Sequence, residues 1–166
     1  MSQLKIIINN QQETILLGEL LTAHLAPSSF LALSGDLGAG KTTFTKGIGK
    51  ALGIKRVINS PTFTIMKTYD TNNLNGINQL YHLDVYRLLD SKGDFELEEY
   101  FYLEGVTVVE WCDIIKDLIP DDYIKMEFKI TGDESRIITM TEYGNINILK
   151  DLEIDLKEHN YEIICR

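Results

Sequence analysis

The segment Gly35–Thr42 reads GDLGAGKT and fits the pattern GxxxxGK[ST], in which every fixed position serves the binding of phosphate. Its glycines allow successive backbone N–H groups to turn toward phosphate oxygens, because no Cβ obstructs that path. Lys41 supplies a cation for the β- and γ-phosphates of a nucleotide, and Thr42 offers its hydroxyl to Mg²⁺. We therefore expect ATP or ADP, with Mg²⁺, to be held by a P-loop that consists of Gly35, Asp36, Leu37, Gly38, Ala39, Gly40, Lys41, Thr42 and Thr43.

Two carboxylates stand where two apolar segments end. Asp84 closes the segment Leu80–Asp84, and Glu110 closes the segment Val106–Glu110. In open α/β sheets ligands bind beside the carboxyl ends of the strands, so both side chains are expected near the P-loop. Hydrolysis of ATP needs a carboxylate that holds Mg²⁺ and a group that orients the attacking water. We predict that Lys41, Asp84 and Glu110 carry catalysis, and the sequence leaves open which carboxylate contacts Mg²⁺ directly.

Two further segments allow more than one interpretation. The hydroxyls of Ser60 and Thr62 lie on a proline-containing loop, which is either a switch-like loop that presents them to metal or γ-phosphate or a turn that leads into a strand. His82 lies on an alternating segment, where a histidine is more often packed or hydrogen-bonded than a catalytic base. We therefore predict a switch-like loop with Ser60 and Thr62 and assign no chemistry to His82.

The P-loop must be positioned by a strand before it and a helix after it. The segment Phe30–Leu33 is a short continuous apolar run, which is typical of a buried strand. The segment Thr42–Leu52 has helical composition and stops near Gly53, a residue type that often follows the last helical turn. An earlier helix is expected to have Thr14 as its N-cap and to run through Leu25.

The remaining strands are predicted from alternating or continuous apolar patterns, and they are Leu4–Ile8, Thr62–Tyr69, Leu80–Tyr86, Val106–Val109, Tyr123–Ile130 and Arg136–Thr141. The last two strands are expected to form a hairpin around Thr131–Glu134, and the tail from Asn145 onward is ambiguous. Strands that alternate with helices and loops indicate the α/β class. We predict a P-loop NTPase-like three-layer fold with a central, mostly parallel sheet and a C-terminal antiparallel hairpin.

Length and composition limit the class of protein. A chain of 166 residues with 44% hydrophobic residues can bury one core, so residues 1–166 are expected to form a single P-loop ATPase domain. The formal net charge of -9 disfavours direct binding to nucleic acid. Neither a signal peptide nor an apolar run near the roughly 20 residues of a membrane span is visible. The two cysteines lack metal or disulfide spacing, which favours a cytoplasmic protein without a membrane partner.

Four segments together resemble the bacterial TsaE (YjeE) family of ATPases. They are GDLGAGKTTF at Gly35–Phe44, SPTFT at Ser60–Thr64, HLDVYRL at His82–Leu88 and the pair Glu110-Trp111. They follow the order and similar spacing of the family, and the combination is more specific than the P-loop alone. The resemblance extends over most of the chain.

This resemblance implies an activity and partners. It implies an ATPase, slow on its own, that is needed for threonylcarbamoyladenosine modification of tRNA and works with the TsaB–TsaD complex. The partners would then make the tRNA contacts, which agrees with the acidic charge of this chain. It also implies that Lys41 and Thr42 hold phosphate and Mg²⁺, and that Asp84 is a Walker-B-like companion of Glu110.

The resemblance further implies positions for other residues. Ser60 and Thr62 would form the switch-like loop near the γ-phosphate, Thr14 would lie near the nucleotide, and Arg136 of the late hairpin would approach it.

Two other functions remain compatible with the motifs. A small-molecule or nucleoside kinase shares the P-loop but usually needs several arginines around the transferred phosphate. The chain has Arg56, Arg87, Arg136 and Arg166. A nucleotide-binding regulatory module without turnover is the third possibility, and it differs from the ATPase in whether Asp84 and Glu110 affect rate.

Overall fold

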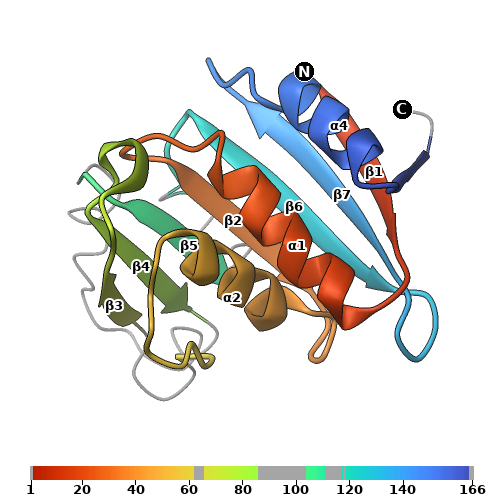
Figure 1. Cartoon of the computed structure of the whole chain (residues 1–166), viewed down its shortest axis with the longest axis horizontal. Coiled ribbons are helices and arrows are strands. Elements are labelled where there is room, and N and C mark those ends of the chain that lie inside the picture. Colours follow the sequence, from red (N-terminus) through yellow and green to blue (C-terminus); the bar gives the residue numbers. More distant parts are fainter. Residues whose placement is uncertain (1, 62–65, 86–103, 111–116, 118, 165–166) are drawn as a thin grey trace.

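The computed structural model describes residues 2–61, 66–85, 104–110, 117 and 119–164. Within them one sheet of eight strands has the order β3-β4-β5-β2-β6-β7-β1-β8 (Figure 1). The strands are β1 (Gln3–Ile8), β2 (Phe30–Gly35), β3 (Met66–Asp70), β4 (Gln79–Asp84), β5 (Val106–Glu110), β6 (Tyr123–Ile130), β7 (Arg136–Tyr143) and β8 (Glu162–Ile164).

The sheet has a parallel core with antiparallel strands on both sides. The pairs β4–β5, β5–β2 and β2–β6 are parallel. Strand β3 is antiparallel to β4, and on the other side β7, β1 and β8 continue the sheet in antiparallel order. This arrangement confirms the predicted α/β class, the parallel centre and the C-terminal hairpin, which is β6–β7. Strand β2 is central, and the continuous apolar run Phe30–Leu33 is fully buried, as predicted.

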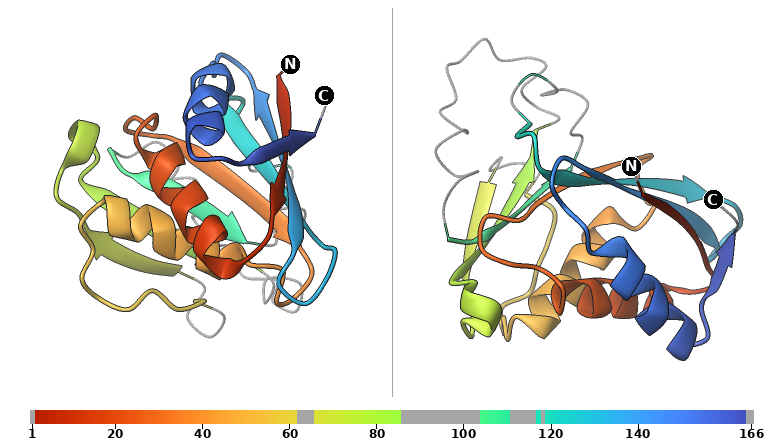
Figure 2. Two further views of the ribbon diagram at one scale, coloured as in Figure 1. Left: turned by 45° about the vertical axis from the view of Figure 1, so that its right-hand side comes forward. Right: turned by 90° about the horizontal axis from the view of Figure 1, so that it is seen from above.

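Three helices pack against the same face of the sheet (Figure 2). They are α1 (Gln11–Thr22), α2 (Lys41–Ala51) and α4 (Leu149–Glu158), and a short 3-10 turn covers Leu74–Gly76. Helices α1 and α2 approach each other where glycines face: a Cβ on Gly47 would lie 2.0 Å from the carbonyl oxygen of Ile15. Because this close contact holds α1 against α2, the first turn of α1 lies beside the P-loop.

The beginning of α1 differs from the prediction. The helix starts at Gln11 with Asn10 as N-cap, whose side chain accepts a hydrogen bond of 3.0 Å from the backbone N–H of Glu13. Asparagine is among the strongest N-cap residues, and the polar first turn of α1 carries no apolar period that would reveal it. Thr14 is therefore not the N-cap but a buried residue of the first turn, and the helix ends at Thr22 instead of Leu25.

Several other boundaries shift or fall outside the described part of the chain. Strand β3 begins at Met66, and the predicted start of this strand at Thr62 lies outside the described residues. Strand β4 ends at Asp84, and the predicted end at Tyr86 also lies outside them. The ambiguous tail forms α4 and then β8, which pairs with β1. Among the helices of the described residues, none is long and apolar enough to cross a lipid bilayer.

Candidate active site

The P-loop connects the end of β2 with the first turn of α2. Gly35, Gly38 and Gly40 have φ values of 144°, 82° and 107°, a region that residues with a Cβ rarely adopt. Gly40 occupies the N-cap position, and no side chain caps the helix there. The backbone N–H groups at the start of α2 and the positive end of its dipole are thus available to an anion. The local geometry is that of a phosphate-binding loop.

Lys41 is the first residue of α2 and is 95% buried, with 5% of its surface exposed. Its ammonium group donates hydrogen bonds to the carbonyl oxygen of Gly35 and, at 3.2 Å, to that of Asp36. The ammonium group is therefore hydrogen-bonded to the backbone of the loop whose phosphate ligand it would bind. Binding of phosphate would replace neutral carbonyl partners by charged oxygens, which are stronger acceptors for an ammonium group.

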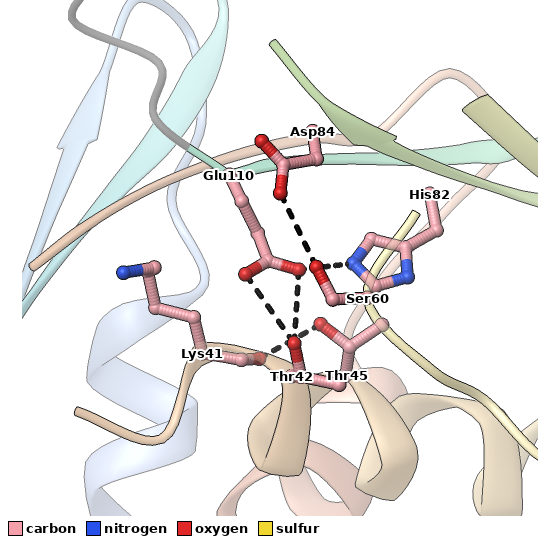
Figure 3. A network of polar contacts seen from close by, with 7 residues as sticks. All are labelled: Lys41, Thr42, Thr45, Ser60, His82, Asp84 and Glu110. Carbon is pink, nitrogen blue, oxygen red and sulfur yellow. Dashed lines mark hydrogen bonds and ion pairs between the residues drawn. The ribbon is translucent and has the colours of Figure 1, made fainter. Parts of the chain in front are cut away.

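Asp84 and Glu110 lie side by side at the carboxyl ends of two parallel strands. They are register partners in the β4–β5 pair, and only 3% and 4% of their surfaces are exposed. The hydroxyl of Thr42 donates to Glu110, at 3.1 Å from Oε2 and 3.3 Å from Oε1 (Figure 3). The predicted strand-end position thus brings both carboxylates to the start of α2, with Glu110 in direct contact with the P-loop threonine.

Ser60 reaches the same place from the segment that follows α2. Its hydroxyl donates to Oδ2 of Asp84 at 3.2 Å (Figure 3). Ser60 is itself exposed, so it can respond to a ligand at the mouth of the site. Thr62, the second hydroxyl of the predicted switch-like loop, lies outside the described residues.

Two cavities flank the P-loop. The larger, of about 510 Å³, has a volume typical of small-ligand sites and is lined by Leu37, Gly38, Ala39, Gly40, Lys41, Thr42, Thr43, Ser60, Asp84 and Glu110. The smaller, of about 240 Å³, is lined by Gln11, Thr14, Gly38, Ala39, Gly40, Thr43, Asp133, Glu134 and Arg136. Gly35 and Asp36 line neither cavity, and both offer their carbonyl oxygens to Lys41. The predicted residues Thr14 and Arg136 therefore meet on one side of the loop and the carboxylates on the other.

Arg136, at the start of β7, binds the P-loop through its backbone. Its guanidinium donates to the carbonyl oxygens of Ala39 at 3.2 Å and Gly38 at 3.1 Å. It also donates to carbonyls of the β6–β7 turn, the shortest at 2.7 Å to Ser135. In a planar trans peptide the C=O and N–H point in opposite directions, so fixing the Ala39 carbonyl turns the Gly40 N–H away from Arg136. Arg136 thereby orients the loop that would bind the anion.

Replacing Arg136 by alanine is expected to weaken ADP binding about tenfold or more, because hydrogen bonds from a charged donor contribute about 1.5–3 kcal/mol each. Calorimetric titration with ADP measures the change. The control is Arg136→Lys, which keeps the charge but not the fork of donors and should fall between the wild type and the alanine variant. Equal ADP affinity in all three proteins would contradict the role of Arg136 in ordering the loop.

The donor set of the larger cavity fits Mg²⁺. This cation prefers oxygen ligands and is usually held by one or two carboxylates together with substrate phosphates. Thr42, Asp84 and Glu110 supply one hydroxyl and two carboxylates, and adjacent buried carboxylates repel each other unless a cation lies between them. Among the described residues no group of three or more His, Cys, Asp or Glu side chains forms a metal site by itself. The arrangement suits a metal that arrives with the nucleotide.

The alternating pattern favours a packed or hydrogen-bonded His82, and the residue is fully buried with its Nε2 at 2.5 Å from Oε2 of Glu110. What sequence reasoning missed is that its partner is the carboxylate of the site. The signal was present in the spacing, because His82 and Asp84 lie on the same face of β4 and Asp84 is the register partner of Glu110. Only the pairing of the two strands converts that spacing into a contact.

Comparison with known proteins gives consistent matches. The family described as Threonylcarbamoyl adenosine biosynthesis protein TsaE matches residues 8–138. The tRNA threonylcarbamoyladenosine biosynthesis protein TsaE of Bacillus subtilis (strain 168) is 47% identical over 145 residues, or 87% of this chain and 89% of that protein. Its namesake in Treponema pallidum (strain Nichols) is 34% identical over 139 residues, or 82% and 99% of the two chains. The crystal structure of Bacillus subtilis YdiB superimposes with a TM-score of 0.76 at 40% identity, covering 96% of this chain and 97% of that one.

Proposed function

The chain belongs to the Threonylcarbamoyl adenosine biosynthesis protein TsaE family, and we propose that it is the ATP-binding and ATP-hydrolysing subunit required for threonylcarbamoyladenosine modification of tRNA. The observation that carries the ATPase part is the contact between Thr42 of the P-loop and the buried carboxylate of Glu110. Two buried carboxylates beside a phosphate-binding loop suit a nucleotide that brings Mg²⁺, because this cation is usually held by one or two carboxylates together with substrate phosphates.

The residues of the site divide the work of hydrolysis. The backbone of the P-loop and the ammonium group of Lys41 hold the β- and γ-phosphates in the larger cavity. Thr42, Asp84 and Glu110 would hold Mg²⁺, which when bound neutralises charge that develops on the phosphate oxygens. Glu110 also accepts a hydrogen bond from the attacking water and thereby aims it. We assign the nucleoside to the smaller cavity beside Thr14, because the larger one contains the groups that act on phosphate.

The acidic charge supports a division of labour among subunits. A net charge of -9 repels the phosphate backbone of tRNA, so this chain is expected to reach tRNA through the TsaB–TsaD complex. We propose that it docks on that complex in the cytoplasm and couples ATP hydrolysis to its turnover. The transfer of the threonylcarbamoyl group itself would belong to the partners.

A kinase is the alternative function, and the larger cavity disfavours it. Kinases surround the transferred phosphate with arginines, whereas Lys41 is the one basic side chain that lines the described part of this cavity. Two of the arginines that could serve a kinase are engaged elsewhere. Arg56 lies 5.0 Å from the ring centre of Tyr69, and Arg136 is bonded to backbone carbonyls. Arg87 lies outside the described residues.

Release of inorganic phosphate from Mg-ATP without any added acceptor distinguishes the two functions. We expect slow release by the chain alone and faster release when TsaB and TsaD are added. A kinase would instead form ADP only when a nucleoside or another small acceptor is supplied. Acceptor-dependent ADP formation without phosphate release, in the presence or absence of the partners, would refute the ATPase proposal.

A further inference from the structure

His82 and Glu110 form a buried pair directly under the start of α2. None of the surface of His82 is exposed, and its Nε2 is 2.5 Å from Oε2 of Glu110. The two residues come from neighbouring parallel strands, β4 and β5, so the backbone that carries them is fixed by the sheet. In Figure 3 the imidazole of His82 lies on one side of the Glu110 carboxylate and the side chain of Lys41 on the other. Glu110 lines the larger cavity, whereas His82 does not line it and contacts Glu110 from within the core.

The surroundings of the two ring nitrogens of His82 determine which of them donates a hydrogen bond. Nδ1 of His82 is buried and has no hydrogen-bond partner among the described residues. An ionised carboxylate can only accept hydrogen bonds, so the ring nitrogen that lies 2.5 Å from Oε2 of Glu110 must be the donor. Nε2 thus carries the hydrogen and donates it to the carboxylate of Glu110.

Two donors from different elements hold the same carboxylate. Oε2 of Glu110 accepts from His82 on β4 and, at 3.1 Å, from Thr42 on α2. One hydrogen bond would fix the direction of the carboxylate but leave it free to rotate about its bond to the side chain, whereas two donors at different angles also fix that rotation. The orientation of Glu110 is therefore determined before nucleotide arrives.

We infer that His82 is a positioning residue for Glu110: its Nε2–H holds the carboxylate in the orientation that serves metal and water. The inference rests on the proposed ATPase function. It predicts that loss of this donor reduces turnover and leaves nucleotide affinity intact, because the phosphates are held by the P-loop and not by Glu110. A misplacement of about 1 Å in a catalytic group can reduce a rate about 100-fold.

The decisive comparison is between two substitutions of similar bulk. His82→Leu fills the space without a donor, whereas His82→Gln places an amide N–H near the position of Nε2. We expect kcat for phosphate release to fall about 10- to 100-fold in His82→Leu and to recover to within about fivefold of wild type in His82→Gln. The affinity for ADP measured in EDTA should change less than about threefold in both. His159→Leu, which removes an exposed histidine far along the chain, is the control and should match the wild type.

The outcomes separate this inference from a structural role and from the proposed function. Equal rates in His82→Leu and wild type, or equal losses in both His82 variants accompanied by weaker ADP binding, would overturn the inference. Nitrogen-15 NMR of wild-type protein at one pH tests it without any variant that must fold, and we expect a hydrogen on Nε2. An Nε2 without a hydrogen would overturn the inference. Wild-type protein that releases no phosphate in any condition would instead refute the ATPase function. The NMR result would still test the hydrogen bond between His82 and Glu110.

Discussion

Replacing Lys41 by alanine is expected to raise the dissociation constant for ATP about 100-fold or more. Lys41 has 5% of its surface exposed and is the one basic residue that lines the described part of the larger cavity, where its ammonium group would meet the β- and γ-phosphates. Each hydrogen bond from a charged donor contributes about 1.5–3 kcal/mol, and Lys41 offers several to phosphate. Calorimetric titration of the variant with ATP and with ADP measures the loss.

Lys46→Ala is the matched control for this experiment. Lys46 lies on the same helix, has the same charge, and is exposed to solvent. Its removal should leave ATP affinity within about twofold of wild type, because an exposed charge is screened by water and salt. An affinity for ATP that survives in Lys41→Ala, or falls equally in both variants, would mean that the nucleotide is not held at the P-loop.

Replacing Glu110 is expected to have the opposite effect to replacing Lys41: a large loss of turnover and little loss of nucleotide affinity. This carboxylate is proposed to hold Mg²⁺ and to orient the attacking water. We therefore expect kcat for phosphate release to fall about 100-fold or more, while ADP affinity stays within about threefold of wild type. Glu110→Gln is the sharper variant, since its amide oxygen still accepts from His82 and Thr42. Glu110→Ala leaves the buried His82 N–H without an acceptor, which should also reduce stability by about 1–3 kcal/mol.

Comparing the two variants isolates the charge of Glu110. Equal loss of turnover in Glu110→Gln and Glu110→Ala, with normal thermal unfolding only in Glu110→Gln, would show that the negative charge and not the packing is needed. Unchanged turnover in Glu110→Gln would remove Glu110 from the mechanism and leave Asp84 as the carboxylate to test.

Local patterns were sufficient to predict the frame of the site. The apolar run Phe30–Leu33, the glycines and Lys41 follow one another along the chain, so strand, loop and helix could be predicted without long-range information. The carboxylates could also be predicted, because Asp84 and Glu110 end apolar segments and parallel strands present their carboxyl ends at one edge.

Features that depend on contacts between distant segments could not be predicted from local patterns, and only the family resemblance placed Thr14 and Arg136 near the nucleotide. The contact of His82 with Glu110 depends on the register of β4 and β5, and the hold of Arg136 on the P-loop depends on where the β6–β7 turn meets residues almost 100 positions earlier. Neither leaves a trace in local composition. Thr14 illustrates the same limit, because its polar type favoured an N-cap although the close packing of α1 on α2 buries it beside Gly40.

The segment that forms α4 was ambiguous for a related reason. Its buried residues Leu149, Leu152 and Leu156 have helical spacing, but its first backbone N–H groups are satisfied by a residue of another element. The carboxylate of Glu142, on β7, accepts from the N–H groups of Ile148 at 3.0 Å and Leu149 at 3.2 Å. No capping residue therefore marks the start of α4 in the sequence.

Formation of threonylcarbamoyladenosine in a reconstituted mixture tests the central claim most directly. The mixture contains TsaB, TsaD, substrate tRNA, the precursors of the threonylcarbamoyl group, Mg-ATP and either wild-type chain, Lys41→Ala or Glu110→Gln. The modified nucleoside and released phosphate are measured in the same tube. We expect repeated rounds of modification with wild-type chain and almost none with either variant. Equal modification with all three proteins, or with the chain left out, would contradict a role for ATP hydrolysis at this site in the modification of tRNA.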